Sequence, residues 1–195
     1  MLSPPWPRCI SKPPPKCYCE DMKLNAWTHD LHTLYEKAVS LYRKGNRDVA
    51  SYFSADEQAF LASIGLKPIN VYDYAEDWVG SGEPDWDTFL LIAAARRDFF
   101  LYEQDGKANP AELNGNELPS RKTALGGIEW LPRIIKKARC FLEGSLCDDV
   151  MYCCGGDRGF LQRHDIHPAD FLRVVWSSRQ DDEKILAFVR SGQAL

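Results

Sequence analysis

The stretch "FLASIGLKPINVYDYA", residues 60–75, contains the end of one helix, a turn and the start of the next helix. It follows Ser54 and Glu57, whose spacing predicts a capping box at the N-terminus of the first helix. Gly65 suits the left-handed conformation that follows many helix C-termini, and Leu66 is placed to fold back onto the helix. The stretch therefore predicts two helices joined by a tight turn.

A second stretch, "FLQRHDIHPADFLRVV" at residues 160–175, aligns with the first without a gap. Phe60 corresponds to Phe160, and Pro68 corresponds to Pro168. One interpretation is an internal duplication of a helical unit. The other is that prolines and capping residues recur wherever helices begin. The sequence leaves both interpretations open.

Apolar residues recur at helical spacing through most of the remaining chain. Besides the helices near residues 54–65 and 167–176, the expected helices lie near residues 30–45, 70–80, 85–106, 130–144, 157–164 and 181–192. Asn70, Asp85 and Asp157 are the predicted N-caps of three of them. Residues 105–127 are rich in Gly, Pro, Asn and Glu and are expected to form a long surface loop. We predict an all-α protein, a compact bundle of about seven or eight helices, with residues 22–195 forming one domain.

The first 21 residues differ in composition from the rest of the chain. They hold six of the twelve prolines and three of the seven cysteines, a composition that does not favour helices or central strands. One expectation is a Pro/Cys-rich disordered tail over residues 1–21. The other is that Met22 is the true start of the protein, because an amphipathic pattern begins directly after it.

Charge and cysteine content narrow the class of protein. The net charge is −4, whereas nucleic-acid-binding proteins usually carry an excess of basic residues. No nucleic-acid partner is therefore expected. No apolar run approaches the roughly 20 residues that span a bilayer, so no membrane partner is expected. The cysteines are odd in number, and no continuous apolar segment opens the chain. These features favour a reducing, cytoplasmic location.

The run "MYCCGGDRGFLQRHDIHPADFL" concentrates residues that can carry chemistry. Cys153 or Cys154 would be a nucleophile if a base such as His164 lay nearby. A zinc site would use Cys153, Cys154, His164 and His167, but the Cys-X-X-Cys spacing is absent, and a proline after His167 makes that histidine a helix cap. The third interpretation is a tight turn with packed thiols.

The same run suggests a site for a small anion. Two glycines before a helix can expose backbone N–H groups, and Arg158 can grip a carboxylate or phosphate. A long apolar helix that carries Arg96 and Arg97 must send one arginine to solvent or pair it internally. The candidate ligand-binding residues are Trp130, Arg133, Gly155, Gly156, Asp157, Arg158 and Arg97. The alternative is a network of local ion pairs that fixes helix packing.

"GGIEWLPRIIKKAR" at residues 126–139 and "YCCGGDRGFLQRHDIHPADFL" at residues 152–172 resemble the bacterial domain-of-unknown-function family 5069. The resemblance consists of a "WLPR" helix, a later Asp-Arg-X-Phe-Leu turn, and a proline-started helix before a short acidic-capped helix. It is clearest over residues 126–190 and extends more weakly back to about residue 30. It implies a compact helical protein and implies no activity.

These observations predict a small-ligand or protein-binding module with a polar cleft near the "WLPR" helix and the "GGDR" turn. The expected partner is a small anionic or amphipathic ligand or another protein, and no cofactor is expected. One alternative is an enzyme that uses Cys153 or Cys154, or a set of Asp157, Arg158 and His164, at the same place. A second alternative is a structural subunit that acts by self-association.

Overall fold

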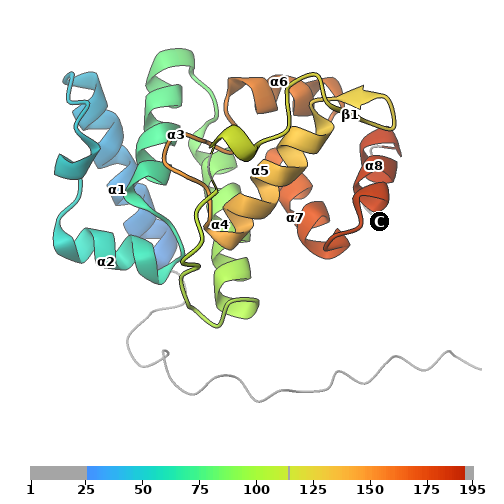
Figure 1. The fold of residues 1–195 in the computed structure, drawn as a ribbon. Coiled ribbons are helices and arrows are strands. Elements are labelled where there is room, and N and C mark those ends of the chain that lie inside the picture. The colour runs from blue at the N-terminus through green and yellow to red at the C-terminus, as the bar shows by residue number, and fades with distance from the viewer. Residues whose placement is uncertain (1–25, 114, 192–195) are drawn as a thin grey trace, which may run out of the picture.

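The computed structural model of the chain describes residues 26–113 and 115–191, and eight α-helices make up most of them (Figure 1). The helices are α1 (Ala26–Arg43), α2 (Ala55–Ser63), α3 (Pro68–Ser81), α4 (Trp86–Tyr102), α5 (Leu131–Glu143), α6 (Gly155–Arg163), α7 (Pro168–Ser178) and α8 (Asp182–Ser191). The prediction of an all-α bundle with seven or eight helices is confirmed for this part of the chain. The expectations for residues 1–21 and Met22 lie outside the described residues.

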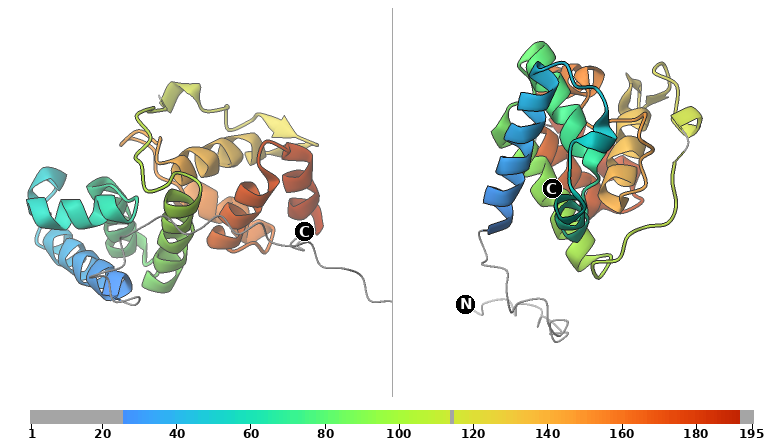
Figure 2. Two further views of the ribbon diagram at one scale, coloured as in Figure 1. Left: turned by 90° about the horizontal axis from the view of Figure 1, so that it is seen from below. Right: turned by 90° about the vertical axis from the view of Figure 1, so that its left-hand side faces the viewer.

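Helix α4 lies between two groups of helices. Helices α1, α2 and α3 lie at one end of the molecule, and α5 to α8 lie at the other (Figures 1 and 2). Helix α4 packs against α5 and α7, while α1 packs along α3. One continuous apolar cluster extends through all of these contacts. Within the described residues, no helix has the length and apolar character needed to cross a membrane.

The turn between α2 and α3 has the same backbone hydrogen bonds as the turn between α6 and α7. In the first turn, Leu66 N–H donates to Leu61 O at 2.9 Å, and in the second Ile166 N–H donates to Leu161 O at 3.0 Å. The residue before each donor has a positive φ, 73° and 55° respectively. Each following helix begins with a proline. The correspondence that the sequence suggested therefore extends to backbone geometry.

Two predicted N-caps are wrong by a few residues. Helix α3 begins at Pro68, and Asn70 lies one turn inside it, where Asn70 Oδ1 accepts from Lys67 N–H at 2.8 Å. Helix α6 begins at Gly155, so Asp157 also lies inside the first turn, behind the N-cap Cys154. In both cases the polar side chain reaches back to the preceding backbone, as the second member of a capping box does.

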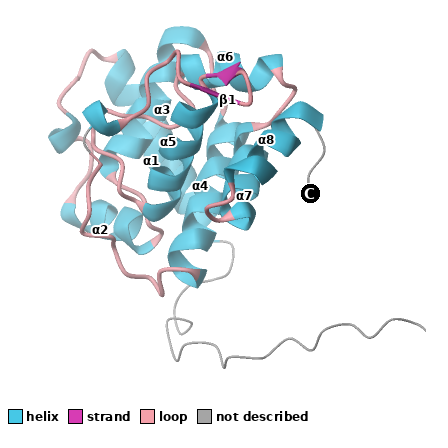
Figure 3. Ribbon diagram, turned by 45° about the vertical axis from the view of Figure 1, so that its right-hand side comes forward, coloured by secondary structure: helices cyan, strands magenta, loops and turns pink. Residues whose placement is uncertain are grey.

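The expected loop at residues 105–127 contains some regular structure. A short 3₁₀ turn forms at Gly115–Glu117, and β1 (Ala124–Leu125) pairs antiparallel with β2 (Ile128–Glu129). Figure 3 shows this small hairpin as the exception in a helical protein. Arg190 on α8 donates to the Gly126 carbonyl at 2.7 Å, so the hairpin tip is fixed to the last helix.

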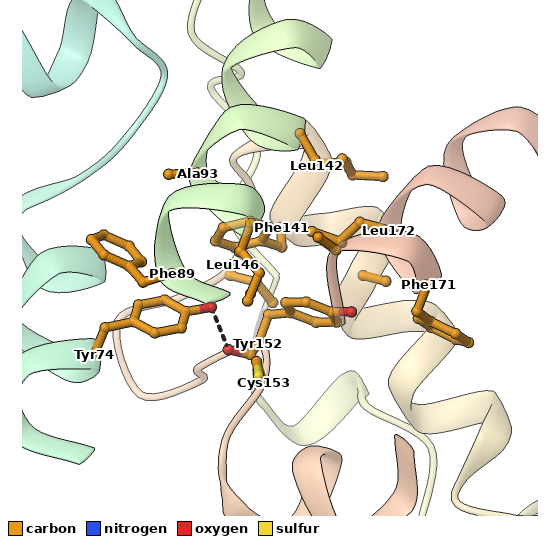
Figure 4. Packing of buried hydrophobic residues seen from close by; sticks show 14 of the residues in the cluster. Tyr74, Phe89, Ala93, Phe141, Leu142, Leu146, Tyr152, Cys153, Phe171 and Leu172 are labelled. Carbon is orange, nitrogen blue, oxygen red and sulfur yellow. Dashed lines mark hydrogen bonds between the residues drawn. The ribbon is translucent and has the colours of Figure 1, made fainter. Parts of the chain in front are cut away.

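Tyr74 and Tyr152 connect the two groups of helices through the core (Figure 4). The Tyr74 hydroxyl donates to the Tyr152 carbonyl at 2.8 Å, and both residues are buried. Tyr74 stacks on Phe89 of α4, and Tyr152 stacks on Phe141 of α5. The hydrogen bond satisfies a buried carbonyl in the segment that leads into α6.

We expect Tyr74→Phe to destabilise the protein by about 1–3 kcal/mol, because the Tyr152 carbonyl is left buried without its donor. Urea unfolding followed by circular dichroism measures the change. Tyr102 is 78% exposed and provides the control, so Tyr102→Phe should change the stability by less than about 0.5 kcal/mol. Equal stabilities for both variants would contradict the role given to this hydrogen bond.

Candidate functional site

A buried carboxylate organises the start of α6. Asp157 is completely buried, and Asp157 Oδ1 accepts from Trp130 Nε1 at 3.0 Å. Its Oδ2 accepts from the Cys153 N–H at 3.1 Å and forms an ion pair with Lys137 Nζ. Lys137 Nζ also contacts Cys154 Sγ at 3.3 Å. We call Trp130, Lys137, Cys154 and Asp157 the Asp157 cluster.

The Asp157 cluster has a more exposed counterpart in the first group of helices. Lys37 on α1 pairs with Glu57 on α2, one hundred residues before Lys137 and Asp157. The Lys37 and Glu57 side chains are 39% and 29% exposed, whereas those of Lys137 and Asp157 are 4% and 0% exposed. A lysine–carboxylate ion pair thus forms at corresponding positions in both groups, near the surface in the first group and in the core in the second.

Trp130 occupies the space beside the glycine pair. A Cβ atom on Gly156 would lie 2.6 Å from the indole ring of Trp130. The missing side chain therefore lets the tryptophan approach α6 closely and donate to Asp157. In this arrangement the glycine provides room for packing.

A separate cavity of about 180 Å³ lies beside Arg96 of α4. Its walls come from the α2–α3 turn, α4, residues 108–109 and the C-terminal end of α5. Arg96 is 3% exposed, and its guanidinium lies against Gly65 and Gly144. Both glycines have positive φ, and a side chain on either one would overlap the arginine or the neighbouring Phe100.

The charge of Arg96 is buried without a carboxylate partner. Its Nη1 donates to Gln104 Oε1 at 2.8 Å, and its guanidinium lies 5.3 Å from the centre of the Phe100 ring. Among the residues that the structure describes, no Asp or Glu forms an ion pair with it. Burial lowers the pKa of the Arg96 guanidinium to about 10, which keeps it protonated at neutral pH. The cavity is therefore positively charged on one side.

A second hollow, of about 680 Å³, lies beside Arg158 at the α6–α7 turn. Four carboxylate residues line it: Glu83, Asp85, Asp165 and Asp170. Arg158 is already paired with Asp77 at 2.6 Å. This hollow is acidic, so its charge does not favour the small anion that was expected near the "GGDR" turn.

The two hollows form at corresponding places in the two groups of helices. Five residues of the α2–α3 turn line the Arg96 cavity, and the residues one hundred positions later line the acidic hollow. The first set is Ala62, Gly65, Leu66, Lys67 and Asn70, and the second is Gln162, Asp165, Ile166, His167 and Asp170. The backbone of the turn is the same in both places, and the side chains give the hollows opposite charge.

The "WLPR" helix, the "GGDR" turn and the last two helices all belong to the group formed by α5 to α8. Residues 116–194 match the model of DUF5069, a domain of unknown function. The family resemblance seen in the sequence is confirmed over this part of the chain. No curated protein and no solved structure matches the chain. The DUF5069 match includes the whole Asp157 cluster, whereas Arg96 and helices α1 to α4 lie before it.

The predicted ligand-binding residues of the DUF5069 segment do not line one cleft. Partly buried Trp130 lies against exposed Gly156 and donates to buried Asp157. Arg133 donates to the Pro119 carbonyl at 2.9 Å, and Arg158 points to Asp77. Gly155 is the first residue of α6. Trp130, Arg133 and Arg158 therefore have different partners, and the structure does not bring all the predicted ligand-binding residues together at one place.

Arg96 and Arg97 lie in different surroundings, and the more deeply buried one is Arg96, which was not among the candidate ligand-binding residues. Arg97, the candidate ligand residue, lies over the Trp27 ring of α1 at 5.0 Å and contacts Asp98 at 3.6 Å. Its neighbour Arg96 turns inward to the cavity. The sequence indicated that one of the two arginines must lie inside the protein or be paired there. Only tertiary packing decides which one is buried.

The catalytic and metal candidates are also separated. Cys153 is buried, and this burial raises the pKa of its thiol. His164 follows the last residue of α6 and packs against Phe160, a full helix away from the N-cap Cys154. His167 caps α7 by accepting from a backbone N–H. No three His, Cys, Asp or Glu residues in the described part of the chain are grouped to hold a metal ion, so the zinc set is not assembled.

Sequence reasoning missed Lys137 and left Arg96 out of the candidate ligand-binding residues, although both are buried in the described part of the chain. Lys137 follows another lysine on an amphipathic helix, where a solvated position is the ordinary expectation. Its spacing of one hundred residues from Lys37 was the available signal, because Glu57 and Asp157 are separated by the same interval.

We expect Lys137→Met to cost about 3–5 kcal/mol of stability, because it leaves the Asp157 carboxylate buried without its counter-ion. The matched control is Lys37→Met, which breaks the partly exposed counterpart and should cost less than about 1 kcal/mol. Urea unfolding at neutral pH measures both values. Similar losses in the two variants would show that burial does not distinguish the pairs.

Proposed function

We propose that this protein is a small-ligand-binding module and that its ligand is an anion held in the Arg96 cavity. The observation that carries the proposal is the buried guanidinium of Arg96, which has no ion-pair partner in the described residues and borders a cavity. Removing a charged group from water without a counter-charge is unfavourable. A bound anion would supply that counter-charge, which the described residues of the protein do not provide. The cavity therefore favours binding of an anion.

The position of the cavity supports this proposal. It lies where α2, α3, α4 and α5 converge, and pockets between helices are common ligand sites in helical proteins. Gly65 and Gly144 have no side chain and let the backbone pack closely against the guanidinium, so the arginine is fixed in place by shape. A fixed arginine loses little further freedom when it binds an anion.

At least one small anion at millimolar concentration should raise the melting temperature of the wild-type protein, since a ligand that binds only the folded state stabilises it. The panel is acetate, butyrate, phosphate and sulfate at constant ionic strength. Arg96→Met should abolish the increase while keeping the unliganded protein at least as stable as the wild type, because an unpaired buried charge is removed. Arg97→Met is the control and should retain the increase. A stabilisation that survives Arg96→Met would refute the site.

A specific observation favours an enzyme as the second candidate. Cys154 is partly exposed at the N-terminus of α6, and Lys137 Nζ lies 3.3 Å from its sulfur. A helix N-terminus and a neighbouring ammonium are typical surroundings of nucleophilic cysteines. In this alternative Cys154 is the nucleophile and Lys137 is the neighbouring cation. His164 has no part in it.

Thiol labelling tests this second candidate. With the protein folded, we expect Cys154 to react with iodoacetamide faster than Cys147, a partly exposed thiol that lacks the contact with Lys137. Cys153 should react only on unfolding, because it is buried and its pKa is raised. Peptide mapping by mass spectrometry identifies each labelled residue, with Cys154→Ser as the assignment control. If Cys154 reacts no faster than Cys147, the enzyme interpretation loses its support.

We also propose that the two groups of helices arose by internal duplication in a bacterial, cytoplasmic protein. The equal turns, the repeated Lys–carboxylate pair and the constant interval support the duplication. The family resemblance supports a bacterial origin. The described cysteines, Cys140, Cys147, Cys153 and Cys154, are all unpaired thiols, which suits a reducing compartment.

A further inference from the structure

Two asparagines add hydrogen-bond donors to the Arg96 cavity. Asn70 Oδ1 accepts from the Lys67 N–H at 2.8 Å, and Asn109 Oδ1 accepts from the Ala111 N–H at 3.0 Å. These backbone contacts decide which end of each amide is oxygen and leave the NH₂ ends available. Neither NH₂ group has a hydrogen-bond acceptor among the described residues. The polar groups offered to a ligand are therefore donors.

The cavity offers one uncompensated positive charge. Lys67 also lines it, but Lys67 Nζ lies 3.3 Å from Glu112 and 3.6 Å from Asp148 and donates to the Leu146 carbonyl. Its charge is already balanced by carboxylates, whereas the charge of Arg96 is not. A monoanion would neutralise the site, while a doubly charged phosphate or sulfate would leave a buried negative charge, which is unfavourable.

The remaining wall is apolar and limits the size of the ligand. Leu66, Phe100, Phe141 and Leu146 contribute to it, together with two alanines. An engineered apolar cavity of about 150 Å³ takes up benzene, so a volume of about 180 Å³ suits a molecule of roughly six to eight non-hydrogen atoms. A ligand of this size has an apolar part that fills the wall and a charged group that meets the donors.

We propose that the Arg96 cavity binds a small aliphatic monocarboxylate of about four to six carbons. The carboxylate pairs with Arg96 and accepts from the amides of Asn70 and Asn109, and the alkyl chain lies against the apolar wall. The inference rests on the proposed function and adds the chemical class of the ligand. A planar carboxylate matches the two parallel donors of a guanidinium, which fixes the orientation of the chain.

Isothermal titration of the full chain with acetate, butyrate and hexanoate tests the ligand class, with phosphate and the neutral butyramide as comparison ligands. We expect butyrate to bind more tightly than acetate by roughly fourfold per added methylene, as burial of a CH₂ group predicts. Hexanoate should bind at least as tightly as butyrate, and butyramide and phosphate should not compete with it. Tighter binding of phosphate, or an affinity independent of chain length, would overturn the carboxylate assignment while leaving anion binding intact. Failure of every anion would instead refute the proposed function.

Two near-isosteric variants test the donors without disturbing the backbone contacts. Asn70→Asp and Asn109→Asp keep the oxygen that accepts from the backbone and replace the NH₂ group with a second, negatively charged oxygen. Each variant should weaken butyrate binding by at least roughly tenfold, the scale of one lost charge-assisted hydrogen bond with added repulsion. Asn46→Asp introduces the same charge at a partly exposed position outside the cavity and should bind as the wild type does. Unchanged binding by both cavity variants would overturn the role of the amides.

Discussion

The buried carboxylate of Asp157 is the interaction on which the second group of helices depends. Three donors converge on it, from the tryptophan before α5, from Lys137 within α5 and from the backbone that enters α6. Each donor comes from a different part of the chain, so one side chain fixes how α5, α6 and their connection are arranged. A charge in the core is tolerated because its counter-ion and hydrogen bonds are all present.

Arg96 illustrates the opposite situation. Its neighbours are two glycines, an aromatic ring and one amide oxygen, and none of them neutralises it. Helix α4 carries this arginine between the two groups of helices, and α5 ends against it at Gly144 (Figure 1). The arrangement of α5 that Asp157 establishes therefore also closes one wall of the cavity. Packing and the proposed binding site are linked through the same helix.

Repetition explains how one backbone arrangement supplies two different surfaces. Lys67 and His167 both precede a proline-started helix, and Asn70 and Asp170 occupy the same position one turn later. In the first group the surrounding side chains give a small, positively charged cavity, and in the second they give a larger, acidic hollow. The backbone of the turn depends on local hydrogen bonds, so its side chains are free to differ. Binding chemistry can then diverge without a change of fold.

The sequence by itself determined the helices, the tight turns and the proline starts, because these depend on residues within a few positions of one another. The capping box at Ser54 and the cap at His167 were predictable for this reason. Asp157 was predicted to be the N-cap of α6, but it lies inside the first turn, and the N-cap is Cys154. Cysteine is not a typical N-cap residue, so the sequence did not indicate this position. The burial of Lys137 and Arg96 was decided only by the tertiary structure. Their surroundings come from segments distant in the chain, and local periodicity contains no information about which charged side chain those segments will cover.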